Sequence, residues 1–163
     1  MYTVSYQSLR NAGACQPALQ WFKEMSEGKE VVSLATALRD MLEKHGQDET
    51  CTEWMHFAVI NGNILPQHIA TIWDNGHNAA VVVYIEAMRS QEVLRLETEI
   101  AIKRGVLGVT SAAAALIVAD DSKEYRDYCN AVNALTDKQR QIFREYIGQN
   151  NLLLQGIIDS LGE

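Results

Sequence analysis

The stretch Ala79–Ala119 decides the fold, and it reads AAVVVYIEAMRSQEVLRLETEIAIKRGVLGVTSAAAALIVA. It is the most apolar part of the chain, and charged segments flank it on both sides. Residues 78–104 contain neither Gly nor Pro, and Gly105 stands where a helix C-cap is expected. We therefore expect one long helix here, buried at the centre of the fold. The alternation of apolar and charged residues over 94–102 would also suit a half-buried strand, and this alternative stays open.

Apolar residues at helical spacing continue on both sides of this stretch. They predict helices over 6–14, 17–28, 30–45, 48–60, 66–74, 112–119 and 123–135, with two more after Thr136. The expected fold is therefore all-α, a single compact multi-helix domain of about seven to nine helices around a buried central helix. Within this domain of residues 1–163, residues 1–121 would form an array of helical hairpins. Residues 122–163 would form a C-terminal helical hairpin.

The composition narrows the class of protein. The chain has 163 residues, of which 47% are hydrophobic, so it can bury a core. The net charge of -7 disfavours unspecific binding to nucleic acid and permits binding to a basic partner protein. The three cysteines are widely spaced and the N-terminus has no secretory pattern, so we expect a cytoplasmic protein without disulfides. The apolar run 106–119 is too short to cross a membrane.

The N-terminal part contains SLRNAGACQPALQWFKE and, after a helical stretch, CTEWMHFAVINGN. It resembles a module of small uncharacterised phage and prophage proteins. The matching positions are Leu9, Ala14, Cys15, Leu19, Phe22, Trp54 and Phe57. Pro17 and the helix over 30–45 depart from the pattern. The resemblance covers about 65 residues and implies a phage or mobile-element origin but no chemistry. We expect Cys15 to be a small buried residue, because no His or Lys lies close enough in sequence to activate its thiol.

The C-terminal part resembles the opening of a truncated winged helix-turn-helix repressor. The matching positions are Leu135, Thr136, Gln139, Arg140, Ile142, Phe143, Ile147, Ile157, Ile158, Leu161 and Gly162. In that family the recognition helix, which reads the major groove, would follow the Leu-Gly pair, and here the chain ends at Glu163. The resemblance therefore implies a DNA-associated regulator only as an alternative. An amphipathic helical hairpin is the other interpretation of the same residues.

The sequence predicts no catalytic, cofactor-binding or metal-binding residue. It contains no nucleophile elbow, P-loop or Rossmann glycine pattern. His45, Cys51 and His56 could resemble metal ligands, but their spacing fits no common zinc motif. An enzyme would need a site that brings His56, His68 and His77 together with acidic side chains.

The acidic and aromatic segment DDSKEYRDY is the candidate surface for a partner. Its candidate partner-binding residues are Asp120, Asp121, Glu124, Tyr125, Asp127 and Tyr128. They could form a patch for a basic protein, because Tyr is enriched in interfaces. A solvated helix face with buried tyrosines is the alternative.

The leading hypothesis is a non-catalytic phage or mobile-element protein that acts in the cytoplasm of a bacterial host. It would bind and inhibit or modulate a host or defence protein that has a basic surface. A DNA-associated regulator and an enzyme with an unrecognised site are the alternatives. A homodimer is possible, and neither a membrane nor a cofactor is expected.

Overall fold

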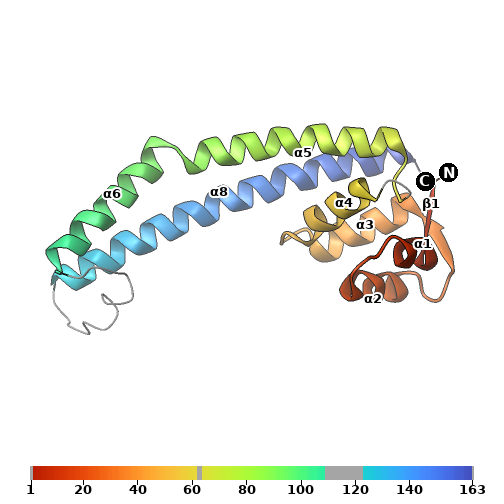
Figure 1. Ribbon diagram of the computed structural model, residues 1–163, viewed down its shortest axis with the longest axis horizontal. Coiled ribbons are helices and arrows are strands. Elements are labelled where there is room, and N and C mark those ends of the chain that lie inside the picture. The colour runs from red at the N-terminus through yellow and green to blue at the C-terminus, as the bar shows by residue number, and fades with distance from the viewer. Residues whose placement is uncertain (1, 62–63, 109–122, 163) are drawn as a thin grey trace. The chain divides into compact units, whose positions relative to one another are not determined.

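The computed structural model describes residues 2–61, 64–108 and 123–162. These residues form seven helices and two short strands (Figure 1). In chain order the elements are β1 (Thr3–Ser5), α1 (Tyr6–Asn11), α2 (Gln16–Met25), β2 (Val31–Ser33), α3 (Leu34–His45), α4 (Thr50–Ile60), α5 (Gln67–Met88), α6 (Gln91–Val106) and α8 (Lys123–Leu161). The mostly helical fold is confirmed, and the two strands were not expected.

The chain divides into two compact units. Unit 1 contains residues 1–81 and 146–163, and unit 2 contains residues 82–145. Two helices contribute to both units, since α5 ends in unit 2 and α8 begins there. Unit 1 therefore combines two segments that lie far apart in the sequence.

The two strands of unit 1 each lead directly into a helix. β1 and β2 pair antiparallel, with the buried Val4 opposite the buried Val32. Ser5 ends β1 and caps α1, because its hydroxyl accepts the backbone N–H of Ser8 at 3.0 Å. Ser33 does the same for α3 through the backbone N–H of Thr36. The residue that ends each strand therefore also starts a helix.

The core of unit 1 is built from every element of that unit. Phe22 of α2 and Leu154 of α8 are fully buried, and Trp73 of α5 and Met55 of α4 are almost so. Partly buried side chains such as Trp21 and Trp54 pack against this cluster. The apolar faces predicted for α2 and α3 thus lie on the core, apart from Val31, which is exposed in β2.

Within unit 1, the first turns of α5 lie beside the last turns of α8 (Figure 1). Gly76 makes this approach possible, because a Cβ there would lie 2.6 Å from Cδ2 of Leu153. The next residue of α5 makes a polar contact with α8, in which Nδ1 of His77 lies 3.2 Å from Oδ1 of the buried Asn150. The helix predicted over 66–74 does not end there, because α5 continues through Gly76 to Met88.

Among the described residues, unit 2 has fewer buried side chains than unit 1. Val93 and Leu96 of α6 are buried, as are Tyr128, Ala131 and Ile142 of α8. An ion pair between Lys138 and Glu92 also joins these two helices, with Nζ 2.7 Å from Oε2. This pair holds the pKa of Glu92 below its usual range, first through the hydrogen bond from Lys138 and then through the charge of its ammonium group.

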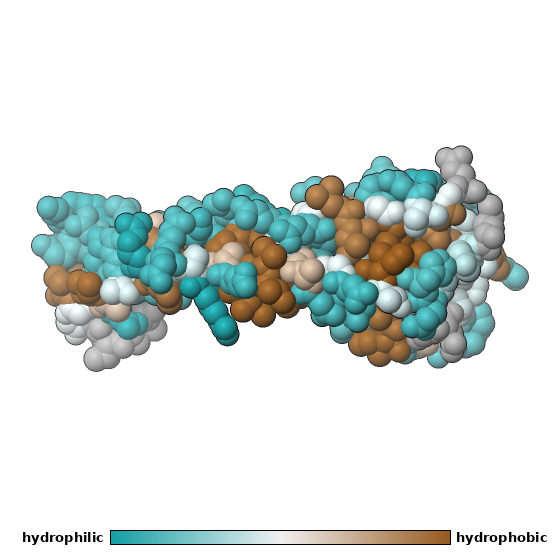
Figure 2. All heavy atoms as spheres, turned by 90° about the horizontal axis from the view of Figure 1, so that it is seen from above, coloured by the Kyte–Doolittle hydropathy of each residue, from teal (hydrophilic) through white to brown (hydrophobic). Residues whose placement is uncertain are grey.

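The single buried central helix expected from the sequence is wrong. Ser90 interrupts it, because its side chain accepts the backbone N–H of Val93 and starts α6 as an N-cap. Several apolar side chains expected to be buried are exposed, such as Val82 at 54% and Ile85 at 41%. Figure 2 shows brown spheres gathered over the C-terminal turns of α5, where these residues lie. The strand alternative is also wrong, since residues 91–106 are helical.

The C-terminal helical hairpin expected over 122–163 is wrong as well. Residues 123–161 form one continuous helix, α8, of 39 residues. Thr136 is therefore not an N-cap, and its hydroxyl instead donates to the carbonyl of Val132 one turn earlier. Gly148 lies inside the helix without ending it.

Two further expectations concern the apolar run 106–119, namely a helix over 112–119 and the absence of a membrane span. The helix predicted over 112–119 lies outside the described residues. In the part of the chain that the structure describes, we find no helix with the length and apolar character that crossing a membrane requires.

Candidate binding pocket

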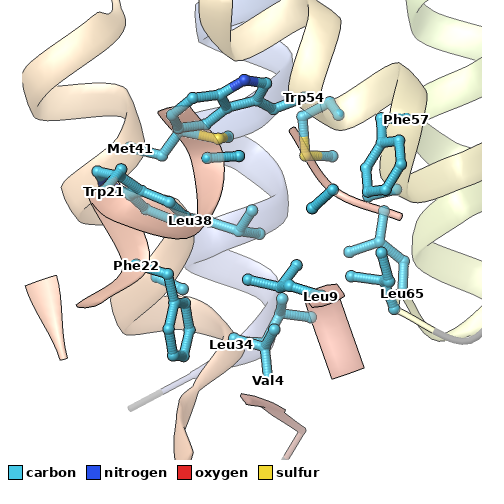
Figure 3. Close-up of a pocket in the computed structure, with 16 residues that line it drawn as sticks. Val4, Leu9, Trp21, Phe22, Leu34, Leu38, Met41, Trp54, Phe57 and Leu65 are labelled. Atoms are coloured by element: carbon cyan, nitrogen blue, oxygen red, sulfur yellow. The ribbon is translucent and has the colours of Figure 1, made fainter. Parts of the chain in front are cut away.

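Unit 1 contains an apolar pocket of about 60 Å³. Its sixteen lining residues come from β1, α1, α2, α3, α4 and the segments that connect them (Figure 3). A single water needs only about 10–15 Å³, so the space is several times larger than one water requires. The lining is apolar and gives water no hydrogen-bond partners, so the pocket suits an apolar group and not a polar one.

The partly exposed aromatic residues mark the edge of this pocket. Trp21, Trp54 and Phe57 are partly buried, whereas Phe22 and Leu34 are buried deeply. The rings of Trp21 and Trp54 lie 5.1 Å apart at a tilt of 45°. Figure 3 shows these side chains around the same space. Such rigid, amphipathic rings at the edge of an apolar space are typical of protein-binding sites.

A polar contact fixes the position of Trp21. Its Nε1–H donates to Oδ2 of Asp40 at 2.7 Å, and Asp40 also pairs with Lys44 at 3.1 Å. On the other side, the ring of His45 lies 5.1 Å from that of Trp54. The rim is therefore held in place by α3, which lies between the two tryptophans in the sequence.

The negative charge of the chain is concentrated in unit 1. Residues 1–81 and 146–163 contain 11 acidic and 5 basic residues, a net charge of -6. Residues 82–145 contain 10 acidic and 9 basic residues, a net charge of -1. Eight of the acidic residues of unit 1 fall between Glu24 and Glu53, in or beside the helices that line the pocket. The pocket therefore lies in the acidic half of the chain.

One of these carboxyl groups is held in its charged form. The hydroxyl and the backbone N–H of Thr50 lower the pKa of Asp48, with the backbone N–H donating at 2.8 Å. This contact lies at the start of α4, where a carboxylate also favours the helix dipole.

The pKa of the Cys51 thiol is shifted in the opposite direction, upward. Burial raises its pKa to about 12, and its Sγ–H donates to the carbonyl of Met41 at 3.3 Å. Cys51 is therefore a structural thiol. Cys15, by contrast, is exposed just before α2, so the expectation of a buried residue there is wrong. Cys15 is the N-cap residue of α2, which begins at Gln16.

The predicted partner patch is only partly described. Asp120 and Asp121 lie outside the described residues. Glu124 is exposed at the start of α8, and Asp127 is partly buried. Tyr128 is 5% exposed and packs into unit 2. Because its ring faces the core of unit 2, Tyr128 is not part of a surface patch.

Tyr125, in the same patch, is partly buried and linked to its own helix. A hydrogen bond with the side chain of Cys129, one turn later, raises the pKa of its hydroxyl. This contact ties Tyr125 to its own helix, so in the described part of the patch Glu124 is the exposed member.

The structure does not bring the three histidines together. The ring of His56 lies 6.2 Å from that of His77, which is stacked on Trp73 at 5.8 Å. His68 instead lies beside Tyr2, at 5.5 Å between rings. In residues 2–61, 64–108 and 123–162, no three His, Cys, Asp or Glu side chains are placed to hold a metal ion.

Sequence reasoning placed the candidate site at the start of α8 and missed the pocket of unit 1. Two signals were available. Trp21 and Trp54 are large side chains with one polar N–H, and a Trp usually places this N–H where it finds a hydrogen-bond partner. The acidic residues also cluster between residues 24 and 53, which a count along the chain reveals.

Comparison with known proteins adds no further guide to this pocket. No protein-family model, curated protein or solved structure matches the chain.

Proposed function

We propose that the protein is a non-catalytic accessory protein of a phage or mobile element. It binds a host or defence protein that has a basic surface, and so inhibits or modulates that protein. The observation that carries this proposal is the apolar pocket of unit 1, which opens beside two tryptophans in the acidic half of the chain. The phage origin rests on the N-terminal resemblance around Cys15 and Trp54.

The pocket supports a particular kind of contact. The pocket of about 60 Å³ is lined by apolar side chains, so an apolar side chain of a partner that enters it is removed from water. Burying one Leu or Phe side chain in this way contributes about 1.5–3 kcal/mol to binding. Anchor residues in central pockets carry most of the binding energy of protein interfaces.

The negative charge of unit 1 indicates which residues of the partner would flank that anchor. A net charge of -6 attracts Lys and Arg and speeds the encounter with a basic protein. The partner segment is therefore an apolar anchor residue flanked by basic residues. An acidic or neutral segment with the same anchor would bind more weakly.

A peptide titration tests this assignment. The probe is a basic helical peptide with one central Leu, and its two controls replace Leu by Ala or the flanking Lys and Arg by Glu. We expect the basic peptide to change the fluorescence of Trp21 and Trp54, and both controls to bind at least tenfold more weakly. Added salt should weaken the basic peptide, since surface charge attraction is screened. Equal binding of all three peptides, or none, would contradict the proposal.

Capture from a bacterial lysate tests the inhibitor role. The bait is the full chain, and the matched bait is Ala58→Val, which fills the pocket from α4. A host protein retained by the first bait and lost from the second would support the proposal, provided that its activity falls when the full chain is added. Retention of the same proteins by both baits would count against it.

A further inference from the structure

We propose that Asp40 receives the Lys or Arg side chain of the partner that lies next to its apolar anchor, and that Lys44 is the internal cation that this side chain displaces. The inference rests on the function proposed for the pocket of unit 1, and it names the residues that select a basic partner. It starts from Asp40, which lies in the middle of α3 and contacts an aromatic residue at the edge of the pocket.

A hydrogen bond joins the carboxylate of Asp40 to the lining of the pocket. Its Oδ2 accepts the Nε1–H of Trp21 at 2.7 Å, and Trp21 lines the pocket from α2. In the part of the chain that the structure describes, no other acidic side chain has a hydrogen bond to a residue that lines the pocket. Asp48, for example, accepts from Thr50 instead. Asp40 therefore places a negative charge in direct contact with the edge of the pocket.

The same helix also reaches the second tryptophan of this edge. The ring of His45 lies 5.1 Å from that of Trp54, and the ring of Trp54 lies 5.1 Å from that of Trp21. Asp40 contacts one tryptophan and His45 the other, and Lys44 lies between them in the sequence. α3 therefore holds the charged pair of Asp40 and Lys44 beside the edge of the pocket.

The carboxylate of Asp40 is open to a partner but is not fully solvated. Its side chain is 24% exposed, and Trp21 already occupies Oδ2. A partly buried carboxylate attracts a cation more strongly than a fully exposed one does, because less water screens its charge. The other oxygen, Oδ1, faces Nζ of Lys44. A basic side chain of a partner would therefore bind at Oδ1.

Lys44 marks the place that this cation would take. Its Nζ lies 3.1 Å from Oδ1 of Asp40, one helical turn earlier, and the Lys44 side chain is 47% exposed. An exposed ion pair between residues i and i+4 of a helix contributes little to stability, so a partner can displace Lys44 at small cost. A partner without a basic residue leaves Lys44 in place and gains nothing from Asp40. The pair therefore favours basic partners, while Lys44 lowers the affinity for each of them.

Calorimetric titration of the full chain tests the role of Asp40. The probes are the basic helical peptide with a central Leu and a neutral peptide in which Gln replaces its flanking Lys and Arg. Asp40→Asn keeps an oxygen for the Nε1–H of Trp21 but removes the charge, and near-UV circular dichroism checks that Trp21 keeps its position. We expect this variant to bind the basic peptide about fivefold more weakly and the neutral peptide as before.

Asp159→Asn is the matched control for the loss of charge. Asp159 is exposed on α8, which contributes no side chain to the pocket, and the substitution changes the net charge by the same amount. We expect it to weaken the basic peptide by less than about twofold. Equal losses in Asp40→Asn and Asp159→Asn would overturn the assignment, because the charge of unit 1 would then act as a whole.

Lys44→Gln tests the displaced cation without altering Asp40 or Trp21. We expect it to bind the basic peptide about threefold more tightly and the neutral peptide as before, because no internal cation competes for Oδ1. Lys29→Gln removes the same charge at an exposed position between α2 and β2 and should have a smaller effect. A Lys44→Gln protein that binds the basic peptide no more tightly than Lys29→Gln would overturn the role of Lys44.

The parent chain separates this inference from the proposed function. A parent chain that binds none of the peptides contradicts the proposed function and this inference together. A parent chain that binds the basic peptide while Asp40→Asn binds it equally well overturns this inference alone.

Discussion

Unit 1 and unit 2 differ in how far they bury their apolar side chains. In unit 1, six helices surround fully buried side chains such as Phe22. Unit 1 also carries most of the net charge of the chain. Among its described residues, unit 2 buries few side chains and leaves Ile102 and Val106 in solvent. The difference teaches that apolar character along a sequence does not by itself locate the core. The described part of the most apolar stretch, residues 79–108, lies mostly in unit 2 and includes these exposed residues.

The largest expected effect is the difference in unfolding free energy between a core variant of unit 1 and a surface variant of unit 2. Phe22→Ala should lower the free energy of unfolding by about 3–5 kcal/mol, because it removes a fully buried ring from the core of unit 1. Leu94→Ala, at an exposed position of unit 2, should change it by less than about 0.5 kcal/mol. Urea unfolding of dilute protein measures both values. Similar losses for the two variants would remove the contrast between the units.

Two cysteines of unit 1 test how tightly the core of that unit is closed. Cys15 is exposed and should react with a thiol reagent at once. Cys51 should react at least about a hundredfold more slowly, because it is buried and burial raises its pKa to about 12. Its folded pKa lies above the unfolded value, so its contribution to stability is present at neutral pH and is lost as the pH rises toward 12. Fast labelling of Cys51 in the native protein would show that unit 1 opens readily.

Two glycines of long helices should respond in opposite directions. Gly76→Ala should destabilise by about 1 kcal/mol, because the added Cβ meets Leu153 and this outweighs the gain in helix propensity. Gly148→Ala should stabilise by about 1 kcal/mol, since nothing lies within 4 Å of its Cβ position. Thermal unfolding compares them. In a Leu153→Ala background Gly76→Ala should also become stabilising, and failure to do so would mean that this contact is not the cause.

The smallest effect concerns the ion pair of unit 2. Glu92→Gln should weaken the contact of α6 with α8 slightly, and high salt should remove the difference from the parent chain. The folded pKa of Glu92 lies below its unfolded value, so the pair stabilises above the unfolded pKa. The contribution is lost as the pH falls through the folded value. Amide exchange of α6 between pH 3 and 7 measures it, and an exchange rate that does not respond to Glu92→Gln would exclude a role for the pair.

The sequence predicted the helices whose apolar faces repeat at regular spacing. The helix starting at Pro17 and the inward faces of Phe22 and Leu38 follow from this pattern, and the structure confirms them. Helix ends were harder to predict. Gly76 and Gly148 look like helix ends in the sequence, but packing against α8 and the length of α8 itself override them.

The candidate site could not be predicted because it depends on contacts across the chain. The pocket forms only when β1 and α2 meet α3 and α4, and no local pattern encodes that space. The two strands were missed for a related reason. Thr3–Ser5 and Val31–Ser33 are each three residues long, and each is followed at once by a helical pattern. The serine caps at Ser5 and Ser33 were visible signals of where each helix begins.

The central claim is that the apolar pocket of unit 1 receives an apolar side chain of a partner. Ala58→Val tests it most directly, because two added methyl groups fill the pocket. Calorimetry of this variant should show a free energy of unfolding that is about 1 kcal/mol higher, and it should show no binding of the basic Leu peptide. The control variant Ala134→Val, at an exposed position of α8, should change neither the stability nor the binding. A stabilised Ala58→Val protein that binds the peptide with unchanged affinity would contradict the claim.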